Sequence, residues 1–215
     1  MKDARAIMSD NVKLDALDML ILYSIYTARG EVSRKVINKV VSYGILVRGG
    51  KFNPVDEPRL LRALRISHFG WIIPDVDERL RKLAEAGFLE LRYEKKGRRE
   101  VIYAKPKDIH GVFEVVKTAL AKELSEARAT AILESINEAL ELYRRGGSEG
   151  LVKALEESTY IAGVKYALVG WDGESYAKVM GELNKRGEEI RKKHPDMPGS
   201  AEFLELRRRI KEPLL

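Results

Sequence analysis

The most regular pattern of apolar and polar positions lies near the middle of the chain, between Pro74 and Pro106. From Val76 to Gly87, apolar or small residues recur every three or four positions, which places them on one face of a helix. Asp75 can cap the start of such a helix, and Gly87 tolerates the left-handed backbone angles that often end one. The pattern therefore predicts a helix from Asp75 to Gly87.

Two short apolar segments follow this helix, and both have the composition of β-strands. The first covers Phe88 to Tyr93 and the second Val101 to Tyr103. Between them lies a basic turn with a glycine, made of Lys95, Lys96, Gly97, Arg98 and Arg99. The stretch thus predicts a helix followed by a β-hairpin with a cationic turn.

The segment LRKLAEAGFLELRYEKKGRREVIYAKP resembles the second half of a winged-helix domain of the PadR and MarR types. Those regulators have a helix with a leucine pattern that ends at a glycine, then a strand, a basic wing containing Gly-Arg and a strand with a tyrosine. The resemblance implies that the helix is a recognition helix and the hairpin a wing that contacts DNA. The alternative is an ordinary helix and hairpin with solvated cations.

Two helices are predicted before this segment. Apolar residues occupy most sides of residues 14–26, which indicates a buried helix ending near Gly30. Residues 31–43 have apolar positions at helical spacing, and Gly44 is expected to end that helix. The resemblance to winged-helix proteins implies one helix-turn-helix domain over residues 1–108. Its second and third helices are separated by an insertion at about residues 45–73.

The insertion contains a short predicted helix from Asp56 to Ile66 with a capping residue at Asp56. Arg59, Arg62 and Arg65 recur every third residue on the side opposite its leucines. Such a stripe can bind successive phosphates, because a guanidinium presents a fork of hydrogen-bond donors that matches phosphate oxygens. The alternative is a solvated helix face.

The segment from Ile109 to Tyr143 has apolar residues at helical spacing, and no proline or glycine interrupts residues 112–145. A single helix of about 33 residues would be roughly 50 Å long, which exceeds what one small domain needs. We therefore expect residues 109–145 to support a homodimer, as the C-terminal helices of PadR-like proteins do. The alternative is that this helix packs against the rest of its own chain.

Residues 146–215 are predicted to form a helical C-terminal region after a break at Arg144–Ser148. Helices are expected over Glu149–Tyr160, Glu174–Lys193 and Ala201–Ile210. Residues 161–171 fit either a buried helix or a strand. The predicted fold class is mainly α with a small β-hairpin: a winged helix-turn-helix domain followed by a helical C-terminal region.

The charge distribution adds a functional expectation to this fold. The chain carries a formal net charge of +6, and residues 48–107 hold 15 Lys and Arg against 9 Asp and Glu, an excess of the same size. A localised basic excess is typical of a phosphate-binding surface. The alternative is a chance fluctuation on a densely charged protein.

The rest of the composition excludes several chemistries. Cysteine is absent and the three histidines are scattered, so neither disulfides nor a Cys or His metal site is expected. No nucleotide-binding or hydrolase motif occurs, which favours a protein that is not an enzyme and uses no cofactor. No segment is apolar enough to span a bilayer, so we expect no membrane partner. The composition fits a cytoplasmic protein of a thermophile.

We therefore expect double-stranded DNA binding, with transcriptional regulation as the role. The candidate DNA-binding residues are Arg59, Arg62, Arg65, Arg79, Arg81, Lys82, Lys95, Lys96, Arg98 and Arg99. The start of the recognition helix is acidic at Asp75, Asp77 and Glu78, which phosphates repel. That feature suits an alternative function, a winged-helix module that binds a protein partner in a larger assembly without reading DNA.

Overall fold

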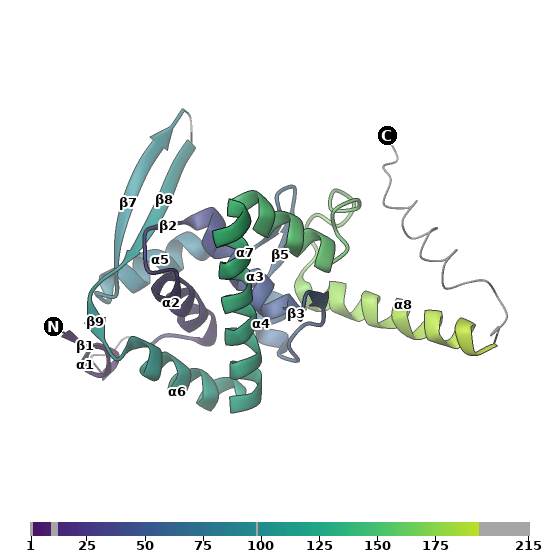
Figure 1. Ribbon diagram of the computed structural model, residues 1–215, viewed down its shortest axis with the longest axis horizontal. Coiled ribbons are helices and arrows are strands. Elements are labelled where there is room, and N and C mark those ends of the chain that lie inside the picture. Colours follow the sequence, from purple (N-terminus) through teal and green to yellow (C-terminus); the bar gives the residue numbers. More distant parts are fainter. Residues whose placement is uncertain (1, 10–12, 98, 194–215) are drawn as a thin grey trace.

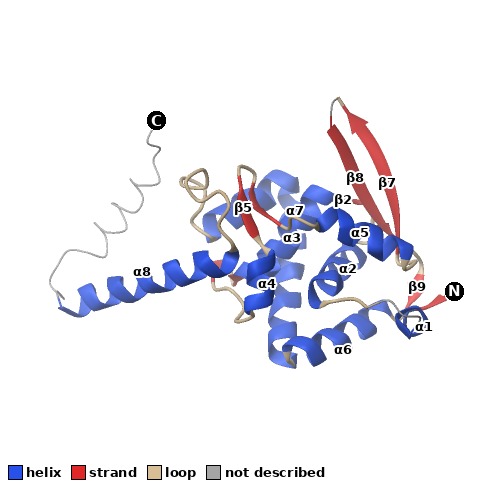
Figure 2. Ribbon diagram, turned by 180° about the vertical axis from the view of Figure 1, so that it is seen from behind, coloured by secondary structure: helices blue, strands red, loops and turns tan. Residues whose placement is uncertain are grey.

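The structure, a computed structural model, describes residues 2–9, 13–97 and 99–193. Helices dominate this part of the chain, and short strands lie at their edges (Figures 1 and 2). At the N-terminal side, β1 (Lys2–Asp3) pairs in parallel with β9 (Ile109–His110), next to α1 (Ala4–Ser9). The other described sheets are antiparallel. The molecule is thus mainly helical with small, mostly antiparallel sheets, as the sequence predicts.

The centre of the molecule consists of three helices and a three-stranded sheet. They are α2 (Ala16–Ala28), β2 (Val32–Ser33), α3 (Arg34–Leu46), α5 (Val76–Glu85), β7 (Leu89–Lys96) and β8 (Arg99–Pro106). The strands lie in the order β2-β8-β7, so β2 joins the edge of a hairpin that follows it much later in the chain.

Helix α2 lies where the sequence predicts it. Asp15 accepts a hydrogen bond from the Asp18 amide, and the Asp18 carboxylate accepts one from the Asp15 amide, so both ends of a capping box are present. The helix ends at Arg29, whose φ of 58° lies in the left-handed region. Because α2 is buried on nearly all sides, it forms the middle of the hydrophobic core.

Helix α3 extends past the residue expected to end it. Gly44 lies inside the helix, where α7 (Glu126–Ser158) packs against it. A Cβ at Gly44 would lie 2.5 Å from Cγ1 of Ile136. The prediction that Gly44 terminates the helix is therefore wrong, because the glycine provides space for a neighbouring helix.

Helix α5 and the hairpin agree with the prediction in order and differ in detail. Gly87 has a φ of 91° and follows the helix end, as expected. The Asp75 side chain caps no backbone amide, because it accepts a hydrogen bond from Arg79 Nε at 2.9 Å. The hairpin strands are longer than expected, with Lys96 paired to Arg99 in register. The expected five-residue turn is wrong, since Gly97 at a φ of 63° permits a two-residue one.

The insertion forms two small hairpins and one short helix. They are β3 (Val47–Arg48), β4 (Lys51–Phe52), α4 (Pro58–Ala63), β5 (Arg65–Ser67) and β6 (Gly70–Ile72). The predicted helix from Asp56 to Ile66 is too long, because Leu64 is extended and Arg65 begins a strand. Its cap is Glu57 rather than Asp56. Arg59, Arg62 and Arg65 consequently do not share one helix face.

The long helix predicted after the hairpin is two helices. Helix α6 (Val112–Leu124) ends at Ser125, whose φ of 75° and ψ of 154° break the helical path before α7. The apolar side of α7 packs against α3 and α2 of the same chain. This is the alternative arrangement, in which the helix packs against its own chain and not against a second copy. The predicted break at residues 144–148 is a kink at Gly147, with a φ of 64°, and α7 continues to Ser158.

The C-terminal region joins the insertion through Trp71, which is fully buried. Its ring lies 5.3 Å from that of Tyr176, and its indole nitrogen donates to Thr159 Oγ1 at 3.1 Å. Residues 161–171 form turns, neither the helix nor the strand considered. Helix α8 (Gly173–Lys193) then extends away from the body (Figure 1). The helix predicted over residues 201–210 lies outside the described residues.

Candidate nucleic-acid interface

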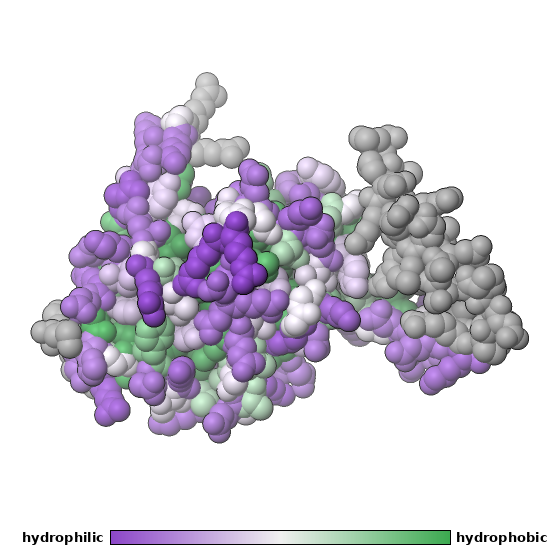
Figure 3. Space-filling view, viewed as in Figure 1, coloured by the Kyte–Doolittle hydropathy of each residue, from purple (hydrophilic) through white to green (hydrophobic). Residues whose placement is uncertain are grey.

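The hairpin β7–β8 projects from the body, and its outer surface is hydrophilic (Figures 1 and 3). Lys95 and Lys96 are exposed near its tip and, as neighbours in a strand, point to opposite faces. Lys96 Nζ lies 3.1 Å from the Tyr103 hydroxyl and 3.5 Å from the Glu94 carboxylate, and these contacts raise the pKa of Lys96. Arg99 is opposite Lys96 in register, and Arg98 lies outside the described residues.

Arg92, which is not among the predicted binding residues, lies on the same face of the hairpin as Lys96. Its guanidinium donates to both carboxylate oxygens of Glu31, at 2.8 and 2.6 Å, and lies 4.4 Å from the centre of the Tyr103 ring. It also donates to Glu94 at 3.3 Å. The register of the hairpin puts Arg92 opposite Tyr103, but nothing near Arg92 in the sequence identifies Glu31 as its partner. The two bonds to Glu31 attach the hairpin to the segment between α2 and β2.

Two of the three candidate cations of α5 hold the helix against α2. Arg79 donates to Asp15 at 2.8 Å, to Asp18 at 2.7 Å and to Asp75, and its side chain is only 17% exposed. Burial opposes its charge, but the hydrogen bonds to Asp15 and Asp18 prevail and raise the pKa of Arg79. Lys82 Nζ donates to the fully buried Asp18 carboxylate at 2.5 Å. Arg79 and Lys82 are therefore structural in this arrangement.

Arg81 differs from its neighbours on α5. Its side chain is exposed and makes no hydrogen bond or ion pair with another described residue. The acidic start of the helix is also partly neutralised, because Asp77 pairs with Arg34 of α3 and Asp75 pairs with Arg79. Glu78 remains exposed. Glu85, at the end of the helix, is exposed as well, so the outer side of α5 presents one unpaired cation and two carboxylates.

The arginines of the insertion separate into two roles. Arg62 pairs with Glu174 and Arg65 Nη1 lies 3.6 Å from Asp172, so both attach α4 and β5 to the start of α8. Arg59 is exposed, and its guanidinium contacts no hydrogen-bonding or charged partner within the described part of the chain. The predicted stripe therefore contains one cation that is available to an external anion.

Of the candidate cations whose side chains the structure describes, Lys95 near the hairpin tip, Arg81 on α5 and Arg59 on the insertion have no ion-pair partner. Lys96 is exposed beside Lys95, although it lies 3.5 Å from the Glu94 carboxylate. Such groups can bind a polyanion through charge and hydrogen bonds. Among residues 2–9, 13–97 and 99–193, no group of His, Asp and Glu side chains is arranged to hold a metal ion. No helix within those ranges is long and apolar enough to cross a membrane. No family model, curated protein or solved structure matches this chain.

Proposed function

We propose that this protein is a winged-helix protein that binds double-stranded DNA and regulates transcription. What supports the fold is the order of elements: α2, β2, α3, α5, β7 and β8, with the sheet order β2-β8-β7. In a winged helix the strand after the first helix joins the edge of a C-terminal hairpin, and the third helix precedes that hairpin. Residues 47–75 are then an insertion between the second and third helices.

The single observation that carries the proposed DNA binding is the cationic tip of a hairpin that projects beside α5. Lys95, Lys96, Arg98 and Arg99 would contact phosphates, and Arg81 would contact a phosphate or a base edge from α5. Glu78 can accept a hydrogen bond from a cytosine amino group in the major groove. Arg59 is a further candidate phosphate contact on the insertion.

The test is fluorescence anisotropy of a labelled random-sequence duplex at several salt concentrations. Each phosphate contact adds about 0.9 to the slope of log K against log salt, so four contacts predict about a hundredfold loss between about 50 and 200 mM salt. The variant Arg98→Ala/Arg99→Ala removes two of the contacts. We expect weaker binding and a slope reduced by about two.

The matched control is Lys185→Ala/Arg186→Ala, which removes the same charge from exposed positions on α8. It should leave the slope unchanged, because these residues lie far along the helix that leaves the body (Figure 2). Equal slopes for the two double variants would reject the hairpin tip as the binding surface. A salt-independent affinity in the unmodified protein would reject DNA binding through phosphates altogether.

A second candidate function is a winged-helix module that binds another protein. Six cations of the basic stretch are engaged with carboxylates of this chain: Arg62, Arg65, Arg79, Lys82, Arg92 and Lys96. Much of the basic excess is therefore used inside the molecule, which favours this candidate. It predicts affinity for a protein partner with little dependence on salt.

A homodimer stays a prediction, but the surface expected for it is unsuitable. The apolar side of α7 is buried against α3 and α2, so it is not free to pair with a second copy. If a dimer forms, it uses another surface and brings two hairpins to two half-sites of one duplex. Sedimentation equilibrium over a range of concentrations gives the oligomeric state.

A further inference from the structure

Helix α8 has an apolar side that the rest of the described chain leaves exposed over much of its length. Tyr176, Val179 and Leu183 are three and four positions apart, so they share one face of the helix. Tyr176 is buried, but Val179 is 38% exposed and Leu183 is 55% exposed. Helix α4 contacts the start of α8, where Glu174 pairs with Arg62, and α8 then leaves the body (Figures 1 and 2). The apolar side therefore extends beyond the core.

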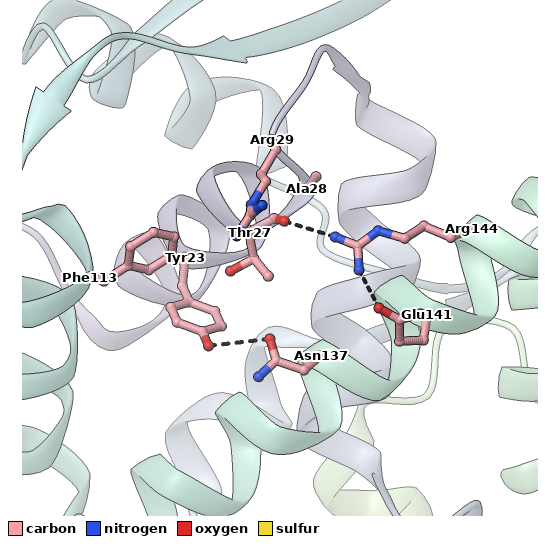
Figure 4. Close-up of a pocket in the computed structure, with 8 residues that line it drawn as sticks. All are labelled: Tyr23, Thr27, Ala28, Arg29, Phe113, Asn137, Glu141 and Arg144. Carbon is pink, nitrogen blue, oxygen red and sulfur yellow. Dashed lines mark hydrogen bonds and ion pairs between the residues drawn. The ribbon is translucent and has the colours of Figure 1, made fainter.

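An exposed apolar side chain on the body is packed differently. Phe113 is 39% exposed, but its ring meets the Tyr23 ring edge to face with centres 5.6 Å apart, beside a cleft between α2, α6 and α7 (Figure 4). Across this cleft, Arg144 donates to the Thr27 carbonyl oxygen at 3.0 Å. Leu183 is more exposed than Phe113 and lies on a helix that has left the body. Phe113 thus has an aromatic neighbour within the described chain, and the apolar side of α8 needs a cover from elsewhere.

The segment that fits this side is residues 201–210 of the same chain, which the sequence predicts to be a helix. Phe203, Leu206 and Ile210 recur there at spacings of three and four, so they would form one apolar face. Seven residues with two prolines and a glycine separate the segment from the end of α8. That composition is typical of a turn, and connections of this length commonly join packed helices.

The two segments match in length and in spacing. From Leu183 to Lys193 the helix rises about 15 Å, and a helix over residues 201–210 would span about the same distance. In one antiparallel register the facing positions are Leu183 with Ile210, Gly187 with Leu206 and Ile190 with Phe203. Alternating spacings of four and three are those of the facing positions in a coiled coil. A Cβ at Gly187 would meet no atom within 4 Å, so there is room opposite it for a leucine.

We propose that residues 201–210 fold back on α8 as a second helix and cover its apolar side, which makes the two segments an antiparallel helical hairpin. Removal of apolar side chains from water drives the packing. The short connection keeps the segment at a high effective concentration near α8, which favours it over a second copy of the chain. This proposal does not depend on DNA binding.

The chain contains no cysteine, so an engineered pair of cysteines reports directly on the packing. The test compares two double variants of the full chain during mild oxidation, Asn184→Cys/Arg207→Cys and Lys185→Cys/Arg207→Cys. Asn184 and Arg207 border the apolar side at the same edge of the proposed hairpin, and Lys185 lies on the opposite side of α8. We expect the first pair to form a disulfide within one chain at least about tenfold faster than the second.

Electrophoresis without reductant separates the looped monomer from a disulfide-linked dimer. Equal rates for the two pairs would overturn the proposal, because a segment that is not packed on α8 reaches both sides alike. A linked dimer in place of the looped monomer would also overturn it, since a second copy would then cover α8.

A further substitution in the first pair tests the apolar contact itself. Leu183→Asn should slow formation of the looped monomer about tenfold, because it removes a leucine from the proposed interface. Lys178→Asn, at an exposed position on the opposite side of α8, should leave the rate unchanged. Circular dichroism checks that each variant is folded. Equal rates for Leu183→Asn and Lys178→Asn would show that the apolar side of α8 does not hold the segment and would refute the proposal.

Discussion

At the scale of single residues, Lys39 has the most unusual environment. Its side chain is almost fully buried, and Nζ donates to the carbonyl oxygens of Phe69 and Trp71, both at 2.6 Å. Burial lowers the pKa of Lys39 from 10.5 to about 8, and the Glu156 carboxylate only partly offsets this. Lys35 and Lys165 lower the pKa further. Lys39 attaches β6 to α3 while its charge is disfavoured.

This lowered pKa predicts how stability depends on pH. Between about pH 8 and 10.5 the unfolded chain keeps the Lys39 proton and the folded chain loses it, so the free energy of unfolding rises with pH. The rise should reach about 2 kcal/mol between about pH 8 and 10. Urea denaturation at several pH values measures it. The Lys39→Met variant should lack the rise, and identical slopes for both proteins would contradict the assignment.

The upper end of that pH range is set by tyrosines. Burial, and to a lesser extent the Asp108 charge, raises the pKa of Tyr26 to about 12, and burial also raises the pKa values of Tyr43 and Tyr176. These folded-state values lie above the ordinary one, so the unfolded chain releases tyrosine protons first above about pH 10. The tyrosines then lower stability as pH rises. The comparison with Lys39→Met is therefore made below pH 10.

At the scale of elements, the attachment of α8 depends on a glycine at its first residue. A Cβ at Gly173 would lie 2.8 Å from the backbone oxygen of Leu61 in α4. We expect Gly173→Ala to destabilise the protein by about 1–3 kcal/mol, because backbone cannot move aside cheaply. The measurement is chemical denaturation followed by circular dichroism.

Gly181 provides the matched control within the same helix. A Cβ there meets no atom within 4 Å. Gly181→Ala should stabilise α8 by about 0.5–1 kcal/mol, since glycine is a poor helix former. If both alanine variants changed stability alike, close packing at the start of α8 would not be the reason for the effect of Gly173→Ala.

The elements that the sequence predicts well are those with local signals. The helix before Gly87 has both a buried stripe and a glycine end, and the hairpin has strand-forming segments around Gly97. The errors occur where the local pattern is a poor guide. Gly44 resembles a helix end but accommodates Ile136, and the helix breaks at Ser125, where the sequence has neither a glycine nor a proline. Neither effect is visible in a local pattern.

At the scale of the whole molecule, net charge identifies a stretch of sequence and not a surface. Residues 48–107 contain the basic excess, but Arg62 and Arg65 bind the start of α8, and Arg79 and Lys82 bind the start of α2. Their partners lie 61 to 112 positions away in the sequence. Sequence alone therefore suffices to propose the hairpin cations as an interface, because they lie at a turn. It does not show which helix cations are paired with distant carboxylates.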